Sequence, residues 1–181
     1  MNSNTAFFVF LLYLLKFLSA KLVIDKFDWK ANEEFCTVNI STQREADGNL
    51  VFNYSMSQCC DFEKQFFYLT LRSKKTKDDD SFSNLLFRTT IDVCKVIKGA
   101  MSNFIVKIIM EGVRKSTDFA LECPFKKNTY KFVNFKADLS MMPPIFHGEH
   151  GLLIIGKLMV KVTGNKQIGH ALTLNIYFKN I

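Results

Sequence analysis

The fold is decided at residues 123–130, Cys-Pro-Phe-Lys-Lys-Asn-Thr-Tyr, where the pattern of the chain changes. A helical spacing of apolar residues precedes this stretch, and strand and turn signals follow it. Pro124 has no backbone N–H to donate, and it disfavours helix at the residue before it. Cys123 can in addition be bridged to a cysteine upstream. We therefore expect a fixed corner at which the chain leaves a helix and enters its last strands.

One helical pattern lies upstream of this corner. Apolar residues recur there at steps of three and four, which is the spacing of one helix face; they are Cys94, Ile97, Met101, Phe104, Ile105, Ile108 and Ile109. Asp92 stands where an N-cap residue belongs, and Gly112 fits a helix end. The spacing predicts a helix at about 94–113.

The remaining segments read as strands, because apolar residues alternate and turn signals separate the runs. The expected strands lie at about 21–30, 36–40, 50–56, 67–71, 85–93, from 130, 152–162 and 168–178. Asp47-Gly48 and residues 164–167 read as hairpin turns. Gly156 is expected to interrupt its strand, whereas the last strand alternates strictly from Ile168 to Phe178. The pattern predicts a mainly β domain, an Ig-like β-sandwich or β-cup, with one helix.

The first residues predict export. Residues 6–15 are an unbroken apolar run, far shorter than the ~20 residues that span a bilayer. The small pair Ser19-Ala20 suits a cleavage site, so we expect a signal peptide at 1–20 and one secreted domain at 21–181. An uncleaved anchor or a buried element are the alternatives. Two glycosylation sequons, at Asn39 and Asn53, fall on the outward faces of their expected strands.

No pattern of a catalytic site is present. The chain lacks a nucleophile elbow, a phosphate-binding loop and a zinc-protease motif. His147 and His150 could form an acid–base pair, but no nucleophile is suggested near them. His170 falls on the apolar face of the last strand and is expected to be a hydrogen-bonded core residue. We expect no enzyme, no cofactor and no metal, because the cysteines and histidines lack zinc-ligand spacing.

Charge and aromatic content favour a binding protein. The formal net charge is +7, but the lysines are spread without a dense stripe, so we expect no nucleic acid partner. Candidate contacts to a lipid headgroup, which otherwise form a solvated face, are Lys126, Lys127, Lys157 and Lys161. With 19 Phe, a small sandwich either packs tightly or holds its sheets apart around an apolar cavity. Periodicity does not distinguish the two.

Several motifs together carry a family resemblance that covers nearly the whole of 21–181. They are Phe27-Asp28-Trp29 followed by Cys36, the run from Asp92 to Ile97, residues 123–130, Pro144, Gly148-Glu149-His150 and the final hairpin. The chain resembles an insect family of secreted proteins of unknown function, close to the chemosensory B proteins. It is also similar to the ganglioside activator protein of the lipid-recognition (ML) superfamily. The resemblance implies a cup-shaped apolar cavity between two sheets.

The resemblance also implies how the cysteines pair. In the activator protein the cysteines that match Cys94 and Cys123 are bonded, so this bridge is expected here. The activator's partner for Cys36 lies in the last strand, where this chain has no cysteine and His170 stands near. Cys36 is therefore expected to bond Cys59 or Cys60. Because the mature part holds five cysteines, one is left over.

Alternation then names candidate residues for the cavity lining. They are Phe52, Tyr54, Phe67, Leu69, Leu71, Ile97, Met101, Phe104, Ile105, Ile108, Leu174 and Ile176. The favoured hypothesis is a secreted, non-catalytic carrier of a lipid or other hydrophobic small molecule, with a role in chemosensation. The alternative is an extracellular interaction module whose own side chains fill the interior, and which modulates a membrane receptor or channel. A hydrolase that uses His147 or His150 is the third hypothesis.

Overall fold

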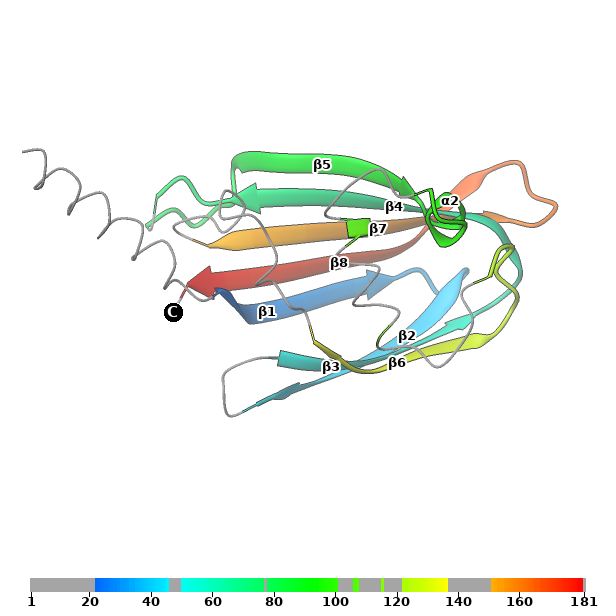
Figure 1. Ribbon diagram of the computed structural model, residues 1–181, viewed down its shortest axis with the longest axis horizontal. Helices are drawn as coiled ribbons and strands as arrows, with labels where there is room; N and C mark the ends of the chain where they lie inside the picture. The colour runs from blue at the N-terminus through cyan, green and yellow to red at the C-terminus, as the bar shows by residue number, and fades with distance from the viewer. Residues whose placement is uncertain are drawn as a thin grey trace, which may run out of the picture.

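The computed structural model describes residues 22–45, 50–76, 78–100, 106–107, 115, 122–136 and 151–180. These residues form two antiparallel β-sheets that face each other, with a short helix at one end (Figure 1). The prediction of a mainly β sandwich is confirmed. The expected signal peptide at 1–20 lies outside the described residues, as does the segment that holds Pro144, His147 and His150. Within the described ranges, no helix is long and apolar enough to cross a membrane.

The larger sheet has five strands in the order β1-β8-β7-β4-β5. Their bounds are β1 Leu22–Ala31, β8 Ile168–Asn180, β7 Leu152–Val162, β4 Phe62–Ser73 and β5 Asn84–Asp92. β7 and β8 form the expected hairpin, in which Lys161 pairs with Ile168. Gly164, with φ of +82°, lies in the connecting turn and takes the left-handed conformation that suits glycine. This sheet forms one wall of the sandwich.

The smaller sheet has three strands in the order β2-β3-β6. Their bounds are β2 Cys36–Arg44, β3 Leu50–Gln58 and β6 Thr129–Lys136. The β3–β6 pairing shifts register between Phe52 and Tyr54, because β6 carries an extra residue there. Asn134 takes φ of +56° in this bulge, and its N–H donates to the side chain of Asn53 at 3.0 Å. The bulge lets β6 keep its inward alternation on both sides.

β7 is continuous, so the expected interruption at Gly156 is wrong. A Cβ on Gly156 would stand 2.4 Å from Cζ of Phe67 on the neighbouring strand β4. The glycine is there because the Phe67 ring lies across the strand, against its backbone. It therefore makes room for an aromatic side chain between the sheets and does not end the strand.

β8 departs from strict alternation at its start. The pairing with β7 shifts between Leu158 and Met159, so that Leu158 pairs with Leu172 and Met159 with His170. Ala171, in the bulge, is buried, and Ile168 is 49% exposed. The expected inward set therefore holds only from Leu172 onward, because a bulge shifts the side-chain phase of the residues before it.

The helix is shorter than expected. α2 spans Val93–Ile97, and the Asp92 carboxylate accepts a hydrogen bond from the Lys95 N–H at 3.1 Å. The predicted start and N-cap are therefore confirmed. The chain leaves the helix at Lys98, and Gly99 with φ of +92° follows, as in a glycine-terminated helix end. The prediction of one continuous helix over 94–113 is wrong at this turn.

The core consists of two clusters of buried side chains between the sheets. One lies beside α2 and the 123–130 corner; its most buried members are Cys36, Phe62, Val160 and Ala171. The other lies farther along the sandwich and includes Phe52, Leu69, Leu71, Leu152 and Phe178. Half-buried aromatic and aliphatic side chains border both clusters.

Candidate functional site

One end of the sandwich is held shut by directional bonds. We call it the closed end and define it by Asp61, Phe62, Cys94, Cys123 and Phe125. Phe62 and Phe125 exchange both of their backbone hydrogen bonds, at 2.8 and 3.0 Å. The Asp61 carboxylate accepts from the Lys127 N–H at 2.7 Å and from the Lys126 ammonium at 3.0 Å. This segment between β3 and β4 is therefore tied to the corner that precedes β6.

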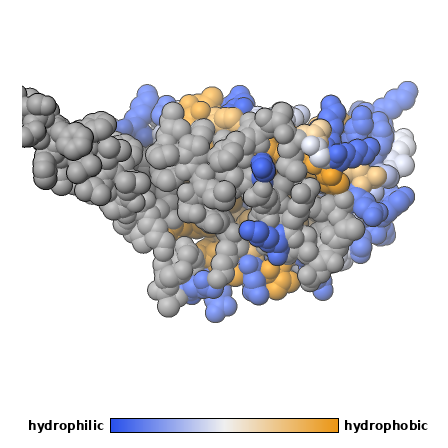
Figure 2. All heavy atoms as spheres, viewed as in Figure 1, coloured by the Kyte–Doolittle hydropathy of each residue, from blue (hydrophilic) through white to orange (hydrophobic). Residues whose placement is uncertain are grey.

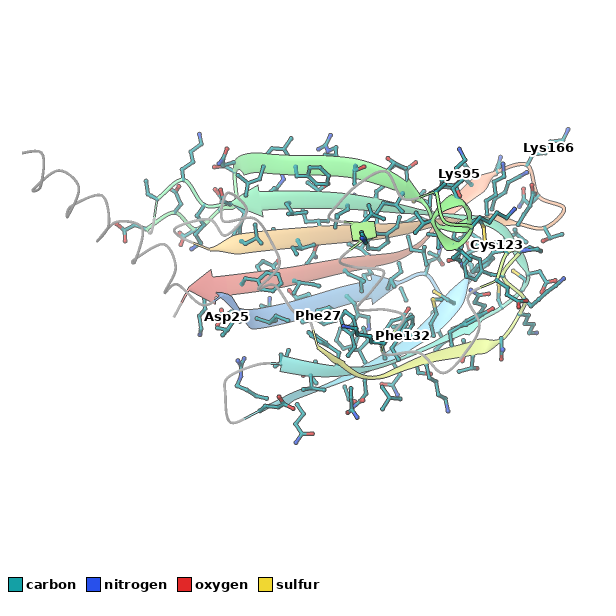
Figure 3. All side chains as sticks on the ribbon, viewed as in Figure 1. Asp25, Phe27, Lys95, Cys123, Phe132 and Lys166 are labelled. Atoms are coloured by element: carbon teal, nitrogen blue, oxygen red, sulfur yellow. A yellow bond between two sulfur atoms is a disulfide. The ribbon has the colours of Figure 1, made fainter. Side chains whose placement is uncertain are left out.

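A disulfide completes the closed end. Cys94 and Cys123 are bonded, with their Cα atoms 5.7 Å apart, as expected (Figure 3). The Cys123–Pro124 peptide bond is cis. The disulfide ties α2, at the end of β5, to the corner that precedes β6. It therefore links the larger sheet to the smaller one.

Farther along the sandwich, aromatic rings from both sheets meet. We call this group the aromatic band and define it by Phe27, Phe52, Tyr54, Phe132 and Phe135. The Phe27 ring of β1 lies 5.0 Å from that of Phe52 on β3. The Tyr54 and Phe132 rings are 5.3 Å apart, and Figure 3 shows Phe27 and Phe132 between the sheets. Edge-to-face ring contacts hold this part of the interior.

The eight candidate lining residues that the structure describes lie in or against the two core clusters. Three of them are buried: Phe52, Leu69 and Leu71. Five keep part of their surface accessible although they pack against the core: Tyr54, Phe67, Ile97, Leu174 and Ile176. Burial raises the pKa of Tyr54, so its hydroxyl stays protonated. The other four candidates, Met101, Phe104, Ile105 and Ile108, lie outside the described residues.

Two buried glutamines add a polar feature that the sequence reasoning missed. Gln58 and Gln65 are 4% and 5% exposed. Alternation puts Gln58 on the inward face of β3 with Met56, and Gln65 on the inward face of β4 with Phe67. Both amide atoms of Gln58 and the Nε2 atom of Gln65 are buried without a hydrogen-bond partner. Such groups cost free energy unless something binds them.

The signal for these glutamines was present in the sequence. Gln58 and Gln65 continue the inward phase of their strands, with Tyr54 and Met56 before Gln58 and with Phe67 and Leu69 after Gln65. A polar residue in the apolar phase of a half-buried strand is a candidate for an internal contact. Both residues stand near the closed end, because the short segment 59–61 joins the strands that carry them.

Two of the four expected headgroup lysines form ion pairs with carboxylates. Lys126 pairs with Asp61 at 3.0 Å, and Lys161 pairs with Glu63 at 2.8 Å. The pKa of Asp61 is lowered, chiefly by the hydrogen bond from the Lys127 backbone N–H and then by Lys126. The pKa of Glu63 is lowered by its contact with Lys161. Lys157 is exposed and faces outward on β7. Two of the four expected headgroup lysines are therefore already paired with a carboxylate of the protein.

The three other cysteines are not bonded, and they are arranged differently from what the resemblance implied. Cys36 is buried at 1% exposure, and its thiol donates to the Ala171 carbonyl oxygen at 3.6 Å. Burial raises its pKa. Cys59 and Cys60 instead approach each other, with their Sγ atoms 2.7 Å apart. Among the described residues, no group of three His, Cys, Asp or Glu could hold a metal ion.

The two sequons occupy the outer face of the smaller sheet, as expected. Asn39 is exposed on the edge strand β2. Asn53 is half-buried on the central strand β3, where its side-chain oxygen supports the β6 bulge. His170 is half-buried, and its ring nitrogen lies 2.8 Å from the Thr173 hydroxyl. It is thus hydrogen-bonded, as expected, but the expected core position is wrong, because the β8 bulge takes His170 out of the inward set and leaves it outside both core clusters.

Comparison with known proteins finds a similarity to an uncharacterised family over part of this framework. The profile of a family described as a protein of unknown function (DUF1091) matches residues 67–150. This match includes β5, α2, both cysteines of the disulfide and β6. No curated protein matches the chain.

Proposed function

We propose that the protein is a secreted, non-catalytic binder of a lipid or another hydrophobic small molecule, held between the two sheets. The observation that carries this proposal is the incomplete burial of inward-facing apolar side chains. In a close-packed sandwich these positions would be covered from the facing sheet. Phe67, Leu174 and Ile176 instead keep accessible surface. Figure 2 shows hydrophobic surface in the region between the two sheets.

The buried glutamines indicate the class of ligand. Ligand pockets are mostly apolar, with a small number of polar groups that fix orientation. The unpartnered amide of Gln58 can donate to and accept from a hydroxyl, carbonyl or carboxyl group, and the unpartnered Nε2 atom of Gln65 can donate to one. We therefore propose an amphiphile with one small polar end directed at the closed end and an apolar body along the aromatic band. Burial of the body contributes roughly 25 cal/mol per Å².

A substitution that fills the space tests the proposal. Leu174→Trp adds bulk on the inward face of β8, beside Gly156 in the pairing with β7. We expect the variant to fold with an unchanged melting temperature and to lose binding of a fluorescent long-chain fatty acid. Asn175→Trp, at the next, outward-facing position, is the matched control and should keep the binding of the wild-type protein.

The opposite result identifies a filled interior. If the sandwich were close-packed, Leu174→Trp would destabilise it by about 1–3 kcal/mol, because overpacking forces strained rotamers. The wild-type protein would also fail to bind the fatty acid after solvent extraction. This pair of results would reject the carrier and favour an interaction module for a receptor or channel.

Export is part of the proposal, and glycosylation tests it. The apolar run at residues 6–15, the exposed sequon at Asn39 and the disulfide all suit an oxidising compartment. In a eukaryotic secretion host we expect enzymatic deglycosylation to lower the mass of the secreted protein. Asn39→Gln and Asn53→Gln should each remove one glycan. A cytosolic, glycan-free protein with the N-terminal residues retained would contradict export.

A further inference from the structure

The bend between β3 and β4 places two thiols in direct contact. Neighbouring side chains of a strand point to opposite faces, so adjacent cysteines in a strand do not meet. Cys59 and Cys60 follow the last residue of β3 and lie where the chain crosses from one sheet to the other. Their Sγ atoms are 2.7 Å apart, which is closer than two unbonded sulfur atoms settle. The bend therefore presents a preformed pair of thiols.

The third thiol differs from this pair in its surroundings. Cys36 packs among the buried residues of the closed end, and its S–H is directed at the Ala171 carbonyl oxygen. Cys59, by contrast, is exposed, and Cys60 is half-buried. Backbone pairing sets Cys36 opposite Gln58, and a bond from Cys36 to Cys59 or Cys60 would cost the contact of its S–H with the Ala171 carbonyl oxygen. Access to solvent and to oxidants favours the pair in the bend.

We propose that Cys59 and Cys60 form a disulfide between adjacent residues and that Cys36 remains a buried thiol. The reaction is an exchange with a small disulfide such as oxidised glutathione. The thiolate of Cys59 attacks one glutathione sulfur and releases one glutathione thiol. The thiolate of Cys60 then attacks the mixed disulfide at Cys59 and releases the second. Two protons leave the protein thiols, and the two electrons pass to glutathione.

This bond would be the more reducible of the two in the protein. Adjacent Cα atoms lie about 3.8 Å apart, whereas an ordinary disulfide has Cα atoms about 4.4–6.8 Å apart, so the geometry of adjacent residues is strained. The next residue, Asp61, binds Lys126 and Lys127 of the corner. The site thus places a redox-sensitive bond beside the contacts of the closed end.

Peptide mapping tests the proposal in the folded, secreted protein equilibrated with oxidised glutathione. Trypsin cuts after Lys30, Arg44 and Lys64, so Cys36 falls in a different peptide from Cys59 and Cys60. After alkylation in denaturant, followed by deglycosylation, we expect peptide 45–64 to be unalkylated and two hydrogens lighter. The peptide with Cys36 should be alkylated. A peptide that links Cys36 to 45–64, or alkylation of both Cys59 and Cys60, overturns the proposal.

Thiol counts in variants give an independent readout. We expect one titratable thiol in denatured wild-type protein, none in Cys36→Ser and two in Cys59→Ser. Titration with glutathione at increasing ratios of thiol to disulfide should open the Cys59–Cys60 bond before the Cys94–Cys123 bond. If both bonds open together, or the Cys94–Cys123 bond opens first, the inferred reducibility is wrong. The mapping of wild-type protein decides the pairing even where a variant does not fold.

Discussion

The closed end and the aromatic band are built in different ways. At the closed end, the corner before β6 is fixed by a disulfide, by a pair of backbone hydrogen bonds between Phe62 and Phe125, and by the Asp61 carboxylate. In the aromatic band the two sheets meet through ring contacts, such as the 5.0 Å approach of Phe27 and Phe52. Phe62 is completely buried, whereas Phe67, nearer the band on the same strand, is half-buried.

This difference teaches where the sandwich can adapt. Hydrogen bonds and disulfides have narrow geometric optima, so the closed end can hold only one arrangement. Ring contacts also have preferred geometries, but these span a wider range of distances and tolerate displacement. We infer that the closed end positions the two sheets, while the band is the part that can accommodate a guest molecule. The following predictions test this division, from the largest expected effect to the smallest.

Truncation of one phenylalanine at the closed end and of one nearer the aromatic band should show the difference between the two regions most clearly. Phe62→Ala removes a fully buried ring and should lower the free energy of unfolding by about 3–5 kcal/mol. Phe67→Ala removes a half-buried ring that lies over Gly156, and should cost roughly half of that or less, because less surface returns to water. Urea denaturation of both variants measures the difference. Equal losses would mean that the interior is packed alike throughout.

Removal of the disulfide should affect the whole fold. Its cysteines are 29 residues apart, and a loop of this length is worth about 3–4 kcal/mol in the chain-entropy account. The double variant Cys94→Ala/Cys123→Ala should show this loss in urea denaturation. Cys59→Ser/Cys60→Ser is the matched control and should lose far less, because a bond between neighbours closes almost no loop. A larger loss of stability in the control would show that the bend at Cys59 and Cys60 stabilises the fold more than the Cys94–Cys123 disulfide does.

Replacement of a buried amide should weaken ligand binding and raise the stability of the ligand-free protein. In the ligand-free protein, Gln58→Leu removes two buried groups without partners and should stabilise the fold by about 1–3 kcal/mol. The same variant should lose affinity for a long-chain fatty acid relative to wild type, whereas its affinity for a plain alkane chain should change less. Calorimetric melting and ligand titration measure the two effects. Destabilisation of the ligand-free variant would show that the amide is satisfied in solution.

Acid should weaken the closed end through Asp61. Its folded-state pKa is lowered by the Lys127 backbone N–H and by Lys126, so the carboxylate contributes stability above its unfolded pKa of about 3.9. This contribution is lost as the pH falls from there through the lowered folded value. Asp61→Asn should therefore be less stable than wild type at pH 6, with a difference that shrinks below pH 4. A difference that is constant with pH would contradict this assignment.

Local signals were sufficient for most of the strands. Alternation placed the final hairpin, because polar turn residues at 164–167 separate two alternating runs. The N-cap at Asp92 was equally local, since one carboxylate at a helix start satisfies a backbone N–H. The helix length was not predicted correctly, although the Lys98-Gly99 pair carries a local stop signal. Apolar spacing continued past this pair, and it outweighed the glycine in the prediction.

The candidate site depends on contacts that no local pattern contains. Gly156 read as a break because its role is set by Phe67, a residue far away in sequence. The contact of Cys59 with Cys60 requires the bend between the sheets, whereas a regular strand would separate them. Gln58 and Gln65 were visible as polar residues in an apolar phase, but their lack of partners is a property of the packed interior. Periodicity reports which face a residue is on and not what meets it there.

Native mass spectrometry of the secreted protein, purified without organic solvent, tests the central claim most directly. If the interior holds an amphiphile, the spectrum should show the protein with a bound lipid-like mass, which disappears after solvent extraction and in the Leu174→Trp variant. If the wild-type protein appears only at its covalent mass, and also takes up no fatty acid added before the measurement, the sheets enclose no ligand site and the proposed function is wrong.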